Sequence, residues 1–325
     1  MSTDPVPVIE DAPVFRVLSL DGGGIKGTFS ASVLADFEET LGEPLVEYFD
    51  LIAGTSTGGI IALGLGLGLT AKDILNFYES HGPAIFARAK GAFGGLLGAK
   101  YGAEPLREAL VDVFGDRLLG EAKTRLVVPA TNLDTGDVHV FKTAHHARFE
   151  RDHQAKVVDV AMATAAAPTY FRTHRLPAGT PLIDGGLWAN NPMGAVAVEA
   201  LGVLDWPKGS VRLLSISCTE SAPTMRDRSR GGLGIGRWLP NLVGTFMSAQ
   251  SSASIGTATL LLGHDNVHRI SKTVGGDRYK LDGIKEIGSL RGLGSTVARD
   301  EFPKVKQMFL IDKARPFVPL HQGAR

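Results

Sequence analysis

A serine in a glycine-bracketed turn is the first feature of this 325-residue chain that suggests chemistry. Gly54-Thr-Ser-Thr-Gly58 lies between two apolar stretches, the second beginning at Ile60. A strand that turns sharply through Gly-x-Ser-x-Gly into a helix is the nucleophile elbow of serine hydrolases, where small neighbours let the hydroxyl project outward. The start of the helix also favours negative charge. We therefore predict that Ser56 is a nucleophile; the alternative is that it only caps the helix.

Three consecutive glycines upstream could stabilise the charge that such a serine creates. They belong to Asp21-Gly-Gly-Gly-Ile-Lys-Gly27, which lies between an apolar run and a helical pattern. Backbone N–H groups aimed at a tetrahedral oxyanion each lower the barrier by roughly 3–4 kcal/mol. Glycine leaves those groups open to substrate because it has no side chain. The predicted oxyanion loop consists of Gly22, Gly23 and Gly24.

The other residues of this loop have supporting roles. We predict that Asp21 holds the loop by accepting backbone N–H bonds. Lys26 either adds positive charge to the site or is solvated on the first helical turn, and Gly27 completes the motif. The full pattern is expected by chance only about 0.004 times in a chain of this composition, against about 0.3 times for Gly-x-Ser-x-Gly. The glycine loop is therefore the more specific of the two signals.

An aspartate in a third glycine turn is the candidate general base. Asp184 ends a short apolar run, and Gly185 and Gly186 after it allow close approach to another turn. A free aspartate has a pKa of about 3.9 and is a weak base, so the site must hold its hydrogen bond tightly or raise the pKa by desolvation. We predict a dyad in which Asp184 takes the Ser56 proton directly. The alternative role for Asp184 is a helix-cap or turn acid.

Two other catalytic or binding schemes use the same residues. An α/β-hydrolase triad needs a histidine after the acid, and of the nine histidines only three follow Asp184, none in a glycine-flanked turn. An esterase with His264 or His268 in that role remains the alternative. Gly22-x-Gly24-x-x-Gly27 also satisfies the dinucleotide fingerprint, but no acidic residue ends the next expected strand, as that fingerprint requires.

The elements that would position these turns alternate between strands and helices. Apolar runs at 15–20, 48–53 and 182–184 predict strands directly before or at the three turns, and 211–218 and 267–270 predict two more. Helical patterns lie between them and include a capping box at Thr70-x-x-Asp73, a segment at 157–167 and a last helix at 300–313. This alternation indicates an α/β fold with a mostly parallel sheet.

Composition narrows the class of protein. Apolar residues make up 44% and charged residues 21%, which excludes a disordered or fibrous chain. A net charge of +0 argues against a protein that coats nucleic acid, so no DNA or RNA partner is expected. The single cysteine, Cys218, cannot form an internal disulfide and favours a reducing compartment. The first residues lack a signal-peptide pattern, and we expect a cytoplasmic protein.

The sequence has no internal repeat and no clear linker. We expect residues 1–14 to be a flexible arm and residues 15–325 to form a single domain. Two glycine-rich segments, 86–103 and 222–250, are excursions from that domain. The first mixes aromatic and basic residues and is either a membrane contact or an ordinary loop. The second carries Arg226, Arg228 and Arg230, which form either a site for an anionic regulator or a solvated face.

Taken in order, the three motifs resemble those of the patatin-like phospholipase family. The similarity extends to Ala165-Ala-Ala-Pro-Thr-Tyr-Phe171 and Asn190-Asn-Pro192, and covers roughly residues 15–218. The C-terminal part, 219–325, is less recognisable. The resemblance implies a three-layer α/β/α fold and an enzyme that hydrolyses glycerolipid acyl esters through an acyl-enzyme, without metal or cofactor.

The resemblance assigns the same roles that the motifs suggest. Ser56 is the nucleophile, Asp184 its partner, and the three glycines after Asp21 the oxyanion loop. A storage or binding protein on the same fold is an alternative that the intact dyad disfavours. Some compact bacterial members act in anti-phage signalling and are switched on by cyclic dinucleotides, so such a nucleotide is a candidate activator. Membrane phospholipid is the expected substrate, reached by peripheral binding at the inner membrane. The oligomeric state is not predicted.

Overall fold

The computed structural model describes residues 13–87, 98–221, 235–275 and 278–321. Nearly all of the predicted arm at 1–14 lies outside these residues. Most of the excursion at 86–103 also lies outside them, as do Arg226, Arg228 and Arg230 of the second excursion.

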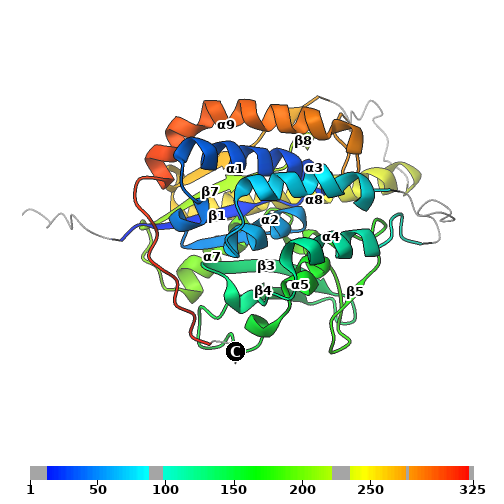
Figure 1. Ribbon diagram of the computed structural model, residues 1–325, viewed down its shortest axis with the longest axis horizontal. Coiled ribbons are helices and arrows are strands. Elements are labelled where there is room, and N and C mark those ends of the chain that lie inside the picture. Colours follow the sequence, from blue (N-terminus) through cyan, green and yellow to red (C-terminus); the bar gives the residue numbers. More distant parts are fainter. Residues whose placement is uncertain (1–12, 88–97, 222–234, 276–277, 322–325) are drawn as a thin grey trace, which may run out of the picture.

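A mixed eight-stranded sheet forms the centre of the molecule (Figure 1). Its strand order is β5-β6-β3-β2-β1-β7-β9, with β4 paired to β3. β3, β2, β1, β7 and β9 are mutually parallel, whereas β4, β6 and β5 run antiparallel to their neighbours. The strands are β1 Phe15–Leu20, β2 Leu51–Gly54, β3 Arg125–Asn132, β4 Val138–Lys142, β5 His174–Arg175, β6 Pro181–Asp184, β7 Val211–Ile216 and β9 Val267–Ile270.

Two short strands, β8 Glu220–Ser221 and β10 Thr273–Val274, pair with each other outside this sheet.

The central strands are apolar because helices cover both of their faces. Along β1, Leu18 and Leu20 belong to one buried cluster, and Val17 belongs to a second cluster on the opposite face. This alternation follows from the period of two along a strand. Buried parallel strands are typically near-continuous apolar runs, as the sequence of β1 is.

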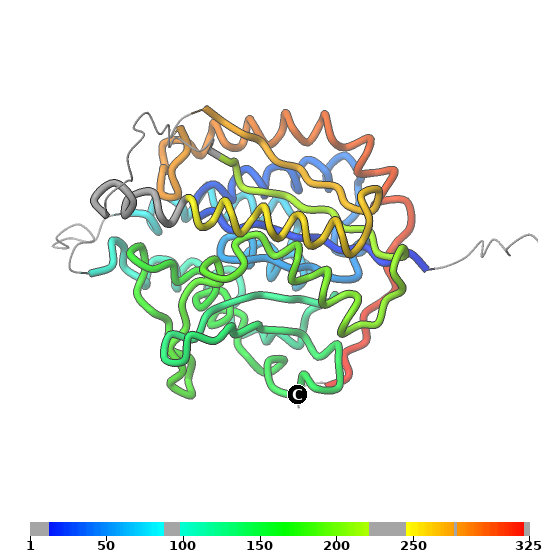
Figure 2. Tube along the Cα trace, turned by 180° about the vertical axis from the view of Figure 1, so that it is seen from behind, coloured from blue at the N-terminus to red at the C-terminus, as the bar shows by residue number. Residues whose placement is uncertain are grey.

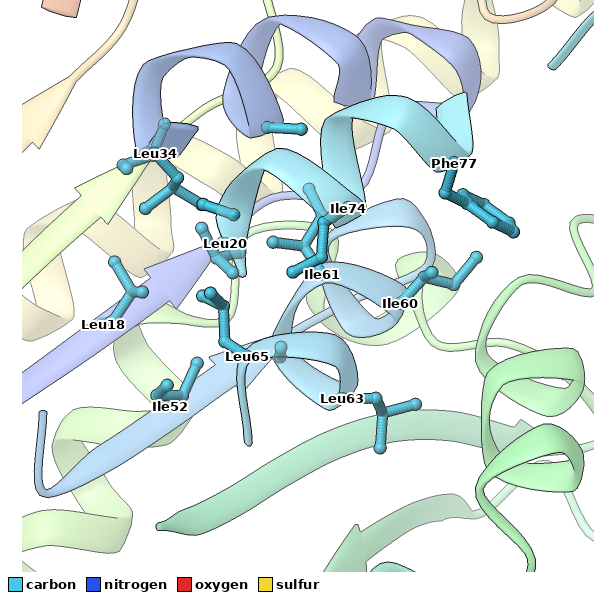
Figure 3. Packing of buried hydrophobic residues seen from close by; sticks show 14 of the residues in the cluster. Leu18, Leu20, Leu34, Ile52, Ile60, Ile61, Leu63, Leu65, Ile74 and Phe77 are labelled. Carbon is cyan, nitrogen blue, oxygen red and sulfur yellow. The ribbon is translucent and has the colours of Figure 1, made fainter. Parts of the chain in front are cut away.

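One helical layer packs against the first of these clusters. It contains α1 Gly27–Leu41, α2 Thr57–Gly66, α3 Ala71–Ile85 and α9 Ile287–Phe309. Figure 3 shows the interior of this layer, where Leu18 and Leu20 of β1 and Ile52 of β2 lie close to Ile61 and Ile74 of α2 and α3. α4 Glu104–Phe114 and α5 Val157–Thr164 contribute to the same cluster.

The other face carries α7 Met193–Val198 and the 28-residue helix α8 Ile235–Leu262. Figure 2 shows the later part of α8 in yellow, lying over the sheet on the side away from α1. A short helix, α6 Gly186–Ala189, contacts α8. Within the described residues, no helix is both long enough and apolar enough to cross a bilayer. The predicted α/β class with a mostly parallel sheet and helices on both faces is confirmed.

Three element boundaries differ from the sequence prediction. The strand expected at 48–53 is confined to β2, because Leu45–Tyr48 after Pro44 forms a 3₁₀ turn. The helix expected at 157–167 ends at Thr164. The last helix begins at Ile287, well before residue 300. Its first half is glycine-rich, which weakens a helical signal, but Gly294 lets it pack closely on the backbone of Phe29.

Candidate active site

Two strands end facing each other along one edge of β3. β2 pairs with residues 125–127 of β3, and β6 pairs with residues 130–132. β4 occupies the opposite edge over residues 127–131, so β2 and β6 must share the same edge. Because β2 runs parallel and β6 antiparallel to β3, their carboxyl ends approach each other. Ser56 follows one of these ends and Asp184 forms the other.

Ser56 has the strained backbone of a nucleophile elbow. Its φ is 54° and its ψ is −121°, and its side chain makes no helix-capping hydrogen bond. The alternative that Ser56 only caps α2 is therefore wrong. The N–H of Ser56 donates to Thr164 Oγ1 at 3.0 Å, and that hydroxyl donates to the carbonyl of Pro129 at 2.6 Å. Thr164 thus fastens the elbow to β3 in the gap between the two strand ends.

Thr164 is not among the predicted site residues, although it directly precedes the Ala165–Phe171 motif. A polar residue at the end of an alanine-rich helix was the available signal.

The elbow glycines are required by backbone contacts. A Cβ on Gly54 would lie 2.0 Å from the carbonyl oxygen of Gly58, and a Cβ on Gly58 would lie 2.3 Å from that of Leu20. A Cβ on Gly27 would similarly lie 2.2 Å from Thr57 Oγ1. No side chain fits between β1, the elbow and the two helices that begin there.

The Asp184 carboxylate is buried beside Ser56. Oδ1 accepts the N–H of Gly186 at 2.7 Å, and a Cβ on Gly185 would lie 2.2 Å from the carbonyl oxygen of Pro129. Desolvation raises the pKa of Asp184 to about 6, although hydrogen bonds from the Ser56 side chain and the Gly186 backbone oppose the shift. Asp184 is therefore a turn acid and also a stronger base than a free aspartate, in contact with the serine.

The three glycines of the predicted oxyanion loop do not have the same role. The N–H of Gly22 donates to the carbonyl of Asn190 at 2.9 Å, and Asn190 Nδ2 donates back to the Gly22 carbonyl at 3.3 Å. The Gly22 amide is thus occupied, which corrects its assignment as an oxyanion donor. Gly23 and Gly24 line the pocket that contains Ser56. Thr57, which follows the nucleophile and was not singled out, lines it too.

Asp21 and Lys26 have partners that differ from those expected. The Asp21 carboxylate accepts from the Arg269 guanidinium, with an Nη2–Oδ2 distance of 2.6 Å, and no described backbone N–H donates to it. Lys26 is partly buried, and its Nζ donates to the carbonyl of Thr219 at 2.8 Å. Burial lowers the pKa of Lys26, and the charge of Glu220 opposes this shift. Both residues therefore hold the loop in place.

A cavity of about 610 Å³ opens onto the dyad. Ser56, Asp184 and Asn190 supply polar groups, and most of the remaining wall is apolar. That wall includes Ile60, Phe77, Ile85, Phe86, Leu106 and Phe171. An apolar cavity with a few convergent polar groups is typical of a site for a largely apolar ligand.

Histidines lie away from this cavity. Among the described residues that line it there is no histidine. His268 lies on β9, and its Nε2 makes a hydrogen bond with Glu301 at 2.8 Å. Two strands lie between β9 and β2, so these two strands are about 14 Å apart. His264 lies at the amino end of β9, opposite the elbow. A Ser–His triad does not fit this geometry. In the described part of the chain, no three His, Cys, Asp or Glu side chains are grouped to hold a metal ion.

This chain is similar in sequence to known proteins. The family model described as patatin-like phospholipase matches residues 18–197. A Pseudomonas aeruginosa protein named cGAMP-activated phospholipase is 40% identical over 246 residues, covering 74% of this chain and 73% of that protein. A Vibrio cholerae protein of the same name is 38% identical over 216 residues, but the match spans only 61% of its length and 60% of this chain. Patatin-like protein 4 of Arabidopsis thaliana is 34% identical, over 59% of this chain and 54% of that protein.

A solved structure shares the fold. The crystal structure of VipD from Legionella pneumophila superposes with a TM-score of 0.53 at 13% identity, covering 90% of this chain and 67% of that chain. The family model spans all three glycine motifs, and a relative of 40% identity matches 74% of the chain. This protein therefore belongs to the patatin-like phospholipase family, and is a lipid acyl hydrolase.

Proposed function

We propose that this protein is a phospholipase A that cleaves glycerolipid acyl esters with a Ser56–Asp184 dyad. The observation that carries this proposal is the meeting of the two residues at an apolar cavity. Ser56 is held in an elbow with a φ of 54°, and Asp184 is a desolvated carboxylate in contact with it. The apolar wall suits an acyl chain, and the polar end of the cavity suits its ester.

Acylation begins when Ser56 Oγ attacks the ester carbonyl and Asp184 takes its proton. The carbonyl oxygen becomes an oxyanion, which accepts N–H bonds from Gly23 and Gly24. Asp184 then donates the proton to the departing alcohol, and the acyl group remains on Ser56. Deacylation follows the same steps with water as the nucleophile. Asp184 takes a proton from the water, and the water oxygen attacks the acyl ester on Ser56. The fatty acid then leaves as Asp184 returns the proton to Ser56 Oγ.

Peripheral membrane binding is part of the proposal. Leu187 and Phe246 line the cavity yet are 43% and 51% exposed, and the adjacent Trp188 is 39% exposed. Large apolar side chains at the mouth of an apolar cavity favour contact with lipid, because Trp and Phe partition into the bilayer interface.

A cyclic dinucleotide is the proposed activator, and a signalling role in anti-phage defence goes with it. The names of the Pseudomonas and Vibrio relatives, cGAMP-activated phospholipase, support the activator. The arginines at 226, 228 and 230 lie outside the described residues, so the nucleotide is not assigned to a site.

Fatty-acid release from phospholipid vesicles tests the proposal. Wild type, Ser56→Ala and Asp184→Asn would each be assayed with and without a panel of cyclic dinucleotides. We expect both variants to lose activity by about 10³-fold or more, since each removes a group that takes part in bond making. Activity that appears only with a nucleotide assigns the signalling role.

Two outcomes contradict the proposal. Activity that survives in Ser56→Ala shows that the elbow is only structural. A wild type that releases no fatty acid under any of these conditions, while it remains folded, favours the storage or binding alternative.

A further inference from the structure

We propose that Arg269 is a positioning residue that holds the oxyanion loop in its working geometry through Asp21. This inference depends on the proposed role of the loop in catalysis. Arg269 lies on β9, in the part of the chain where the sequence motifs give no signal. It does not line the cavity, so its effect on the reaction must be transmitted through another residue.

The Arg269 side chain crosses a whole strand to reach Asp21. β7 lies between β9 and β1, and Ser215 of β7 is the register partner of Arg269. Nη1 donates to Ser215 Oγ at 2.7 Å and to Asp21 Oδ1 at 3.3 Å, and Nη2 donates to Asp21 Oδ2 at 2.6 Å. The small side chain of Ser215 leaves the path open and supplies one of the acceptors.

This contact is a buried, two-pronged ion pair. The side chains of Arg269 and Asp21 are only 12% and 6% exposed. Glu220 adds a second carboxylate, 2.9 Å from Nη2. A guanidinium that binds a carboxylate through two N–H groups fixes the orientation as well as the distance between the groups. Asp21 thus has one strongly preferred position.

Asp21 transmits that position to the catalytic amides because it directly precedes the glycines. Beyond Asp21, backbone groups of Gly22 and Ile25 fasten the loop to other segments of the chain. The Gly22 amide bonds to Asn190, and the N–H of Ile25 donates to the carbonyl of Leu281 at 2.8 Å. The amides of Gly23 and Gly24 lie between these points and make no backbone bond of their own among the described contacts outside helices. The direction in which these two N–H groups point therefore depends on where Asp21 and Ile25 are held. Stabilisation of an oxyanion is sensitive to the direction of its N–H donors.

Substitution of Arg269 in the full-length protein tests this role. Arg269→Met removes the clamp, Arg269→Lys keeps the charge but cannot grip both carboxylate oxygens, and Ser56→Ala sets the background. The matched control is His268→Gln on the same strand, because the His268 ring makes its own hydrogen bond with Glu301 at 2.8 Å, away from the loop. Hydrolysis of a soluble monomeric ester gives kcat and KM without a membrane step.

A second readout includes the oxyanion site without an acyl ester. Ser56 Oγ forms a bond to the phosphorus of a fluorophosphonate while Asp184 takes the Ser56 proton, fluoride is expelled, and the phosphoryl oxygen occupies the oxyanion position. We expect Arg269→Met to lower kcat and the phosphonylation rate together by about 10- to 100-fold, while KM stays within about threefold. Arg269→Lys should lose about three- to tenfold. The pH at which activity is half-maximal should not move, because Asp184 is unchanged.

Each result bears on the inference. Equal kcat for wild type and Arg269→Met, at a temperature where both are folded, overturns it. So does an equal kcat loss in His268→Gln, which indicates general destabilisation. If Arg269→Met does not fold, Arg269→Lys decides: unchanged kcat and phosphonylation rate reject the role. Full activity in Ser56→Ala is a failure of the proposed function instead, and is recognised separately.

Discussion

Asp184 combines two properties that conflict in water, since a carboxylate must be ionised to act as a base but is a poor base when it ionises easily. Burial reconciles them by raising the pKa of Asp184 to about 6. At neutral pH the group is mostly ionised, yet it holds a proton better than a free aspartate. The contacts with Ser56 and the Gly186 amide keep the shift within this useful range.

The pH dependence of hydrolysis follows from this shift. Protonated Asp184 cannot accept the Ser56 proton, so we expect kcat/KM on a soluble ester to fall about tenfold per pH unit below pH 6. The measurement is a kcat/KM profile from pH 4.5 to 8, with folding monitored at each pH. A profile that stays flat down to pH 4.5 is incompatible with this base.

The same burial makes Asp184 costly for stability. Its pKa is raised from 3.8 when unfolded to about 6 when folded, so the native state binds the proton more tightly. Below pH 3.8 the carboxyl is protonated in both states and its burial carries no charge penalty. As the pH rises through 6, the buried group ionises and the free energy of unfolding falls. Asp184→Asn removes the charge, and we expect it to raise the free energy of unfolding at pH 7.5 by up to about 3 kcal/mol.

Urea unfolding of both proteins at pH 7.5 and pH 4 measures this difference. The gain should nearly vanish at pH 4. If Asp184→Asn is less stable than wild type at pH 7.5, then burial of the Asp184 carboxylate does not destabilise the folded protein.

The nucleophile elbow depends on how three elements approach one another. Gly58 lies in the first turn of α2, where the helix passes the end of β1, and a Cβ there would lie 2.3 Å from the Leu20 carbonyl oxygen. We expect Gly58→Ala to abolish activity and to lower the free energy of unfolding by about 2 kcal/mol or more, because backbone must shift to relieve the contact. Assays of ester hydrolysis and urea unfolding check both effects.

Gly256→Ala is the matched control. Gly256 lies inside α8, and a Cβ there would meet nothing within 4 Å. This change should leave activity unaltered and stabilise the protein by about 0.5–1 kcal/mol through helix propensity. Comparable losses in both variants would mean that the elbow has no special steric requirement.

On the scale of the whole molecule, the C-terminal third packs against the part of the chain that carries the three motifs. β9 completes the sheet, α9 packs on α1, and the chain after α9 returns to the opposite side (Figure 1). There the N–H of Ala314 donates to the Glu47 carbonyl and that of Leu320 to the Ala144 carbonyl. We propose that residues 15–325 form one domain for this reason.

The proposed membrane docking depends on side chains from separate segments at the cavity mouth. We expect Ser56→Ala protein, which cannot consume lipid, to float with phospholipid vesicles, and a second change, Trp188→Ser, to weaken this binding by about tenfold or more. The matched control is Leu260→Ser: Leu260 is 82% exposed on α8 but about 21 Å along the helix from Phe246. Equal loss in both variants would reject the cavity mouth as the docking site.

The sequence by itself determined the local chemistry of this protein. Glycine patterns specify tight turns, and apolar runs before them specify strands, so the motifs containing Ser56 and Asp184 could be identified without a structure. The α/β class followed from the alternation of elements. These features depend on residues close together in the chain, which is why one sequence suffices to find them.

Only the tertiary structure decided which groups meet. Arg269 and Asp21 are 248 positions apart, Thr164 and Ser56 are 108 apart, and no local pattern relates either pair. The occupied amide of Gly22 depends on Asn190, 168 positions away. Such contacts are fixed by strand order and register, which result from burying both faces of one sheet. The sequence thus specified the groups that we propose to react, and the packing of distant segments set their geometry.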